Sequence, residues 1–145
     1  MAQPLPRFRP WVLLLVDDEP DILDSVRALL ESSIHGLKVI TASSGRAGLD
    51  LLERERVDLI VSDFKMPGMD GIEFLYQCRR KHVNIPRVML TAFGNEDLAR
   101  RAVVDAFVGA FLSKGANPED LVAGITRLLD YSPSSDPPSP AAPES

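Results

Sequence analysis

The sequence predicts an α/β fold in which helices cover both faces of a parallel sheet. Short, nearly continuous apolar runs recur along the chain, as expected of strands that are buried on both faces. Segments with helical periodicity separate these runs, and strands that alternate with helices in this way form parallel sheets. The chain has 145 residues, of which 45% are hydrophobic, so it is long enough to bury a substantial core as one domain.

The five predicted strands share a run of apolar residues without glycine or proline. They lie at 12–16, 38–42, 59–62, 87–90 and 110–113. The second strand also contains Lys38 and Thr41, which indicates a position nearer the edge of the sheet.

A helical segment follows each strand. The first helix carries Ile22 and Val26 on its apolar stripe and ends before Gly36, a residue type that is common just beyond helix C-termini. The second helix begins at Ser44, and the third begins after the loop 65–70.

The last two helices have sequence signals at their starts. Asn95 can cap the fourth helix, and Asn117 caps the fifth, where Pro118 and two acidic residues follow. Five strands and five helices make a (βα)5 unit, which is a three-layer sandwich. Because right-handed crossovers restrict the strand order, we expect the flavodoxin-like order 2-1-3-4-5. This order places strands 1 and 3 side by side.

The two ends of the chain differ in composition from the middle. Residues 1–10 are rich in proline and arginine and are predicted to be loose, whereas 132–145 contain five prolines and read as a disordered tail or linker. One folded domain remains, at 11–131.

The net charge of −5 does not favour direct binding to nucleic acid. No apolar run approaches the roughly 20 residues of a membrane span, so we expect no membrane contact and a cytoplasmic protein.

Five polar groups follow the ends of predicted strands. Asp17 and Asp18 follow the first strand, Asp63 the third, Thr91 the fourth and Lys114 the fifth. Ligands of open α/β sheets bind where the strands end, so we expect these groups to converge. Asp63 is the candidate nucleophile toward a phosphoryl group. Asp18 and Asp63 suit a hard cation, Mg²⁺ above all, while Lys114 offers a fixed positive charge and Thr91 a hydroxyl donor.

This ordered set resembles the receiver domain of the bacterial response regulators, and the resemblance covers nearly the whole folded part. It implies that Asp63 is the phosphoacceptor, that Asp17 acts on Mg²⁺ mainly through a bound water, and that the backbone carbonyl of Lys65 is a further ligand. The residues that carry the resemblance are Val16-Asp17-Asp18-Glu19-Pro20, the stretch from Ser62 to Gly71, Leu90-Thr91-Ala92 and Phe111-Leu112-Ser113-Lys114.

The resemblance also implies a function. The domain would take a phosphoryl group from a sensor histidine kinase or a histidine phosphotransfer protein, and would act as a switch in a two-component phosphorelay rather than as an enzyme with turnover. Thr91 would move toward the phosphoryl group, and Phe111 would turn inward behind it. The surface of helix 4, strand 5 and helix 5 would then control a downstream effector protein or domain, or form a homodimer.

One position departs from the resemblance. Receivers usually have a proline after the active-site lysine, joined to it by a cis peptide bond, whereas Gly115 follows Lys114 here. A cis bond before a non-proline residue costs about 2.5–4 kcal/mol. We therefore predict a trans Lys114–Gly115 bond.

Three other functions are compared with this interpretation. A receiver fold that signals without phosphorylation stays an alternative. A phosphatase of the haloacid dehalogenase type also uses an aspartate nucleophile with Mg²⁺, but it expects an Asp-x-Asp arrangement after strand 1, where this chain has adjacent acids. A nucleotide- or flavin-binding module needs a glycine-rich loop there, and the acidic segment 17–20 contains no glycine. The sequence identifies neither the kinase nor the output.

Overall fold

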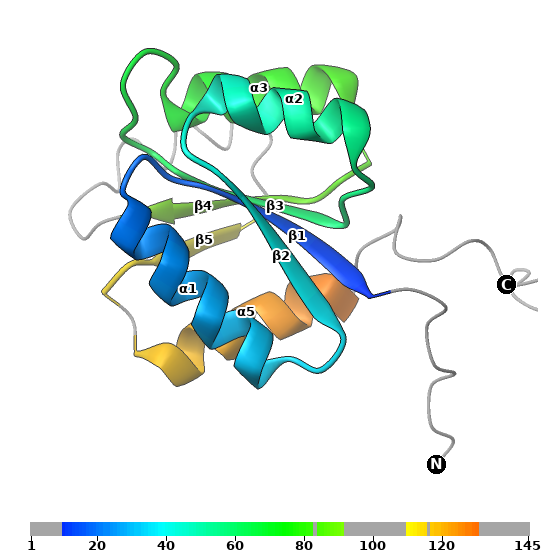
Figure 1. Ribbon diagram of the computed structural model, residues 1–145, viewed down its shortest axis with the longest axis vertical. Helices are drawn as coiled ribbons and strands as arrows, with labels where there is room; N and C mark the ends of the chain where they lie inside the picture. The colour runs from blue at the N-terminus through cyan, green and yellow to red at the C-terminus, as the bar shows by residue number, and fades with distance from the viewer. Residues whose placement is uncertain (1–9, 83, 92–109, 116, 131–145) are drawn as a thin grey trace, which may run out of the picture.

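A single parallel sheet forms the centre of the computed structural model, which describes residues 10–82, 84–91, 110–115 and 117–130. Its strand order is β2-β1-β3-β4-β5 (Figure 1). The predicted order 2-1-3-4-5 is therefore confirmed. The strands are β1 (Trp11–Val16), β2 (Leu37–Ala42), β3 (Leu59–Asp63), β4 (Arg87–Thr91) and β5 (Ala110–Ser113).

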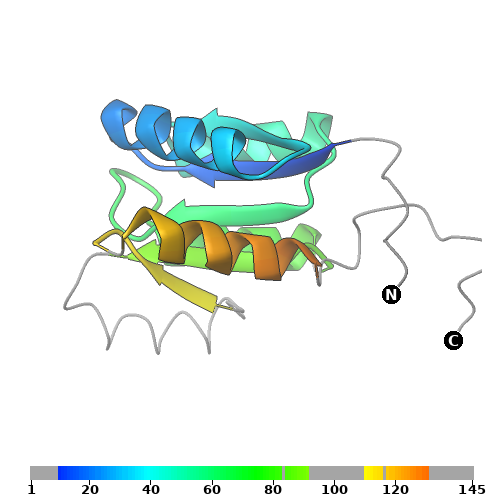
Figure 2. The same ribbon diagram turned by 90° about the horizontal axis from the view of Figure 1, so that it is seen from below.

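Helices cover both faces of the sheet and complete the predicted three layers. Figures 1 and 2 show α2 and α3 on one face and α1 and α5 on the other. The helix predicted to begin at Asn95 lies outside the described residues. No helix of the described part is long and apolar enough to cross a membrane. The helices are α1 (Pro20–Ser33), α2 (Gly45–Arg54), α3 (Gly71–Lys81) and α5 (Pro118–Asp130).

Two apolar cores lie on either side of the sheet. Side chains alternate between the faces of a strand, and β1 shows this directly. Leu13 and Leu15 belong to the core under α1 and α5, whereas Leu14 and Val16 belong to the core under α2 and α3. All four are at most 1% exposed, which explains why the sequence of this strand is apolar without interruption.

Side-chain caps set the starts of three helices. Ser44 Oγ accepts a hydrogen bond from Ala47 N at 3.1 Å. Asp70 Oδ1 accepts from Glu73 N at 2.9 Å, and Asn117 Oδ1 accepts from Asp120 N at 2.8 Å. Such caps satisfy backbone N–H groups that have no partner within the helix. The predicted starts at Ser44 and Asn117 are confirmed.

The register of the sheet brings the predicted polar groups to one edge. Val16 pairs with Ser62 across β1 and β3. The residues that follow them, Asp17 and Asp63, therefore lie next to each other at the ends of adjacent strands. On the other side, Thr91 pairs with Ser113 across β4 and β5. Lys114 directly follows Ser113 and therefore lies at the same edge of the sheet.

Candidate functional site

Asp17 is a fully buried carboxylate at the end of β1. Its Oδ1 accepts a hydrogen bond from Glu19 N at 3.0 Å, which holds the side chain against the turn that leads into α1. Its Oδ2 has no aligned hydrogen-bond donor among the described residues, although Lys114 Nζ lies 3.1 Å from it. A buried carboxylate oxygen without a hydrogen bond is costly. This oxygen can therefore still act as a ligand to a cation.

Asp63 ends β3 and is 6% exposed. Its Oδ1 lies 3.0 Å from Lys114 Nζ. Its backbone packs against the first residue of α3, because a Cβ on Gly71 would lie only 2.0 Å from the Asp63 carbonyl oxygen. The Gly71 N–H donates to the Phe64 carbonyl at 2.7 Å. The close packing of α3 on the end of β3 thus requires glycine at position 71.

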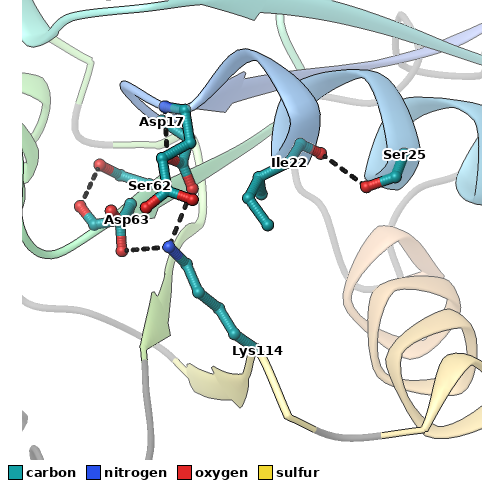
Figure 3. A network of polar contacts seen from close by, with 7 residues as sticks. Asp17, Ile22, Ser25, Ser62, Asp63 and Lys114 are labelled. Atoms are coloured by element: carbon teal, nitrogen blue, oxygen red, sulfur yellow. Dashed lines mark hydrogen bonds and ion pairs between the residues drawn. The ribbon is translucent and has the colours of Figure 1, made fainter.

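Lys114 reaches from the end of β5 to both carboxylates. Figure 3 shows its ammonium group between Asp17 and Asp63, with one ion pair to each. The side chain is 21% exposed, so these pairs are partly shielded from water. The Gly115 N–H donates to Ser113 Oγ at 3.1 Å. The described chain contains no cis peptide bond, so the Lys114–Gly115 bond is trans, as predicted.

The charges of the site are not balanced. Burial raises the pKa of Asp63 above its ordinary value, and the Asp17 carboxylate acts in the same direction, while the hydrogen bond from Lys114 opposes the rise. Burial lowers the pKa of Lys114, but its contacts with Asp63 and Asp17 outweigh burial, and the pKa is raised. The two shifts are consistent, because the ammonium faces two carboxylates while Asp63 faces one ammonium and one carboxylate. A further positive charge would stabilise the site.

The carboxylates fit a divalent cation. Asp17, Asp18 and Asp63 each offer one oxygen, and these oxygens lie within 4.8 Å of one another. Oxygen ligands of this kind suit Mg²⁺, which keeps several of its waters. An open cleft of about 360 Å³ adjoins the cluster, and its lining includes Asp18 and Lys65. Both the donor set and the buried Asp17 Oδ2 therefore fit the ion that the sequence predicts.

The structure brings four of the predicted site residues together, namely Asp17, Asp18, Asp63 and Lys114. The backbone of Thr91 ends β4 at this edge, while its side chain lies outside what the structure describes. Phe111 is half-buried and packs against the core under α2 and α3.

Two neighbours of the site were not recognised from the sequence as supports for Asp63. Gly71 packs against its backbone, and Ser62 Oγ donates to its carbonyl oxygen at 2.9 Å. A glycine in the first turn of a predicted helix was the available signal for Gly71, because glycine there often marks a close approach of two backbones. A serine in a buried strand was the signal for Ser62.

Comparisons with known proteins give one consistent answer. The response regulator receiver domain matches residues 13–126. The chain is 37% identical over 124 residues to the Escherichia coli transcriptional regulatory protein GlrR, covering 86% of this chain and 27% of that protein. It is 36% identical over 119 residues to the Xanthomonas campestris cyclic di-GMP phosphodiesterase response regulator RpfG, covering 81% of this chain and 31% of that protein.

A solved structure extends the agreement to three dimensions. The CheY-like response regulator receiver domain protein of Methanospirillum hungatei superposes with a TM-score of 0.77 at 30% identity, over 85% of this chain and 96% of that one. The chain spans about a quarter to a third of the length of the two curated relatives. Fold, site and sequence agree, and the chain belongs to the response regulator receiver domain family.

Proposed function

We propose that this domain is the phosphoacceptor of a two-component phosphorelay, with Asp63 as the residue that is phosphorylated. The observation that carries the proposal is the position of Lys114 Nζ, 3.0 Å from Asp63 Oδ1 and 3.1 Å from Asp17 Oδ2, beside a cluster of three carboxylates. Three carboxylates and one ammonium favour a bound cation and a phosphoryl group over an uncharged ligand. The family supports a two-component role.

The reaction is a transfer of one phosphoryl group. A carboxylate oxygen of Asp63 attacks phosphorus, and the bond from phosphorus to the donor breaks, which is a P–N bond in a phosphohistidine and a P–O bond in acetyl phosphate. The leaving group keeps the electron pair of that bond, and Asp63 becomes an acyl phosphate. The domain accepts one group and does not turn over a substrate.

The residues of the site act by position and charge. Asp17, Asp18 and Asp63, with the backbone carbonyl of Lys65, would hold Mg²⁺. When bound, this ion supplies positive charge against the repulsion between Asp63 and the incoming phosphoryl group. The Lys114 ammonium, which already contacts Asp63, would move onto a phosphoryl oxygen as negative charge develops there.

Labelling with acetyl phosphate tests the proposal. The full chain is incubated with acetyl phosphate and Mg²⁺, and the phosphorylated fraction is measured by intact mass and by a phosphate-affinity gel. We expect labelling of the wild type, none of Asp63→Asn, and none when the metal is chelated. Asp21→Asn is the matched control, because it makes the same chemical change on an exposed side chain at the start of α1 and should label normally.

Two results would contradict the proposal. Equal labelling of wild type and Asp63→Asn would place the modification elsewhere. Failure of the folded wild type to label, when a known receiver labels in parallel, would favour a receiver fold that signals without phosphorylation.

We further propose that phosphorylation acts through Thr91 and Phe111 to change one surface of the domain. This surface would consist of the helix predicted to begin at Asn95, strand 5 and helix 5. Partners of this surface would be an effector protein or domain, or a second copy of the chain. The half-buried position of Phe111 leaves room for a change in its exposure. Backbone amide spectra with and without beryllofluoride, a phosphoryl mimic, should show changes at Phe111. Changes confined to the loops around Asp63 would count against the switch.

A further inference from the structure

Ser62 is a buried polar residue that the proposed reaction does not use. It is 0% exposed and lies in the sheet between Val16 and Met89. Its Oγ donates a hydrogen bond to the Asp63 carbonyl oxygen at 2.9 Å (Figure 3). A hydroxyl buried without a partner is costly, and Ser62 satisfies its donor on the backbone of the candidate phosphoacceptor.

The peptide unit that joins Asp63 to Phe64 lies between the Ser62 hydroxyl and the candidate phosphoacceptor. Its carbonyl oxygen accepts the hydrogen bond from Ser62. Its N–H group belongs to Phe64, and the Phe64 backbone acts to lower the pKa of the Asp63 carboxylate. A peptide unit is planar, so a hydrogen bond that fixes the direction of its C=O also fixes the direction of its N–H.

We propose that Ser62 is a positioning residue for the phosphoacceptor. Its hydroxyl holds the Asp63–Phe64 peptide unit in the orientation that directs the Phe64 N–H at the Asp63 carboxylate. Without the hydroxyl, the orientation of this peptide unit is less tightly fixed, and the Phe64 N–H is directed less well at the carboxylate. The effect on phosphorylation rests on the proposed function, whereas the hydrogen-bond geometry does not.

The test compares the full chain with Ser62→Ala and Ser62→Thr. The first readout is the amide proton shift of Phe64 in metal-free protein, which reports the hydrogen bond of that N–H group. We expect an upfield shift in Ser62→Ala and a return toward the wild-type position in Ser62→Thr, which restores the hydroxyl. The second readout is the rate constant of labelling by acetyl phosphate, which should fall about threefold to tenfold in Ser62→Ala, the range expected for one lost hydrogen bond.

Ser25→Ala is the matched control. Ser25 Oγ also donates to a backbone carbonyl, that of Ile22 at 3.4 Å, but on the exposed side of α1 (Figure 3). This variant should change neither readout. An unchanged Phe64 amide in folded Ser62→Ala would overturn the proposal, and so would a shifted amide with wild-type labelling. If the wild type itself does not label, the proposed function fails, and the Phe64 amide still decides whether Ser62 orients the peptide unit.

Discussion

Replacing Gly71 with alanine should disable the site by moving the backbone of Asp63. The added Cβ would lie 2.0 Å from the Asp63 carbonyl oxygen and 2.9 Å from Phe64 Cα, whereas real Cβ contacts below 3.0 Å are essentially never seen. The start of α3 and the end of β3 must therefore separate by about 1 Å, because neither contacted atom belongs to a side chain that could rotate away. Overpacking of this kind costs about 1–3 kcal/mol, and a misplacement of about 1 Å can cost on the order of 100-fold in rate.

We expect Gly71→Ala to lose about 2–3 kcal/mol of unfolding free energy and to label with acetyl phosphate at least about tenfold more slowly than the wild type. Urea unfolding followed by circular dichroism measures the first effect, and intact mass measures the second. Gly68→Ala, in the loop that precedes α3, is the control: Gly68 has a φ of 78° and no atom within 4 Å of an added Cβ. It should lose about 1 kcal/mol from the left-handed backbone but label normally. The steric reasoning is refuted if both variants unfold alike and label at the wild-type rate.

Three further predictions concern the buried charges. Burial raises the folded pKa of Asp63, so the folded state holds its proton to higher pH than the unfolded state does, and wild-type stability falls as pH rises through that window. Asp63→Asn should therefore be more stable than wild type in urea at pH 7, with the difference disappearing below about pH 4. Lys114→Met leaves the carboxylates of Asp17 and Asp63 without their ammonium partner, and should lose about 2–3 kcal/mol in chelator, part of which Mg²⁺ restores; no recovery with Mg²⁺ would argue against a metal site. Asp58→Ala removes the acceptor of the Val12 N–H and should lower the unfolding free energy by about 2 kcal/mol. Labelling should not change, because Asp58 directly precedes β3 and so lies at the amino ends of the strands, away from the site.

The strands could be predicted closely because strands that are buried on both faces consist mainly of apolar residues. Apolar runs predicted strands at 12–16 and 59–62, and the structure extends them to Trp11–Val16 and Leu59–Asp63. The added residues are Trp11, which directly follows Pro10 at the start of the domain, and the charged Asp63. Trp11 belongs to β1 because it pairs with Leu37 in the sheet, and that pairing depends on a neighbouring strand rather than on local sequence.

The site could be predicted only in part. Asp17, Asp63 and Lys114 were expected to converge because each follows a strand, and parallel strands end at one edge. The supports of Asp63 could not be predicted in the same way. The contact of Gly71 with the Asp63 carbonyl oxygen depends on the path of the loop that returns the chain from β3 to α3, and no periodicity records that path.

The sequence by itself determined the order of the strands and of the described helices, the chemical groups at the strand ends and the family to which they point. These are properties of composition and spacing, since a buried strand needs apolar residues and a phosphoryl site needs acids, an amine and a hydroxyl. Only the tertiary structure decided that one ammonium, Lys114, serves both Asp17 and Asp63, and that Ser62 bonds the backbone of the residue it precedes. Distances of about 3 Å depend on register and packing between segments far apart in the chain, and hydrogen bonds form only when both are correct.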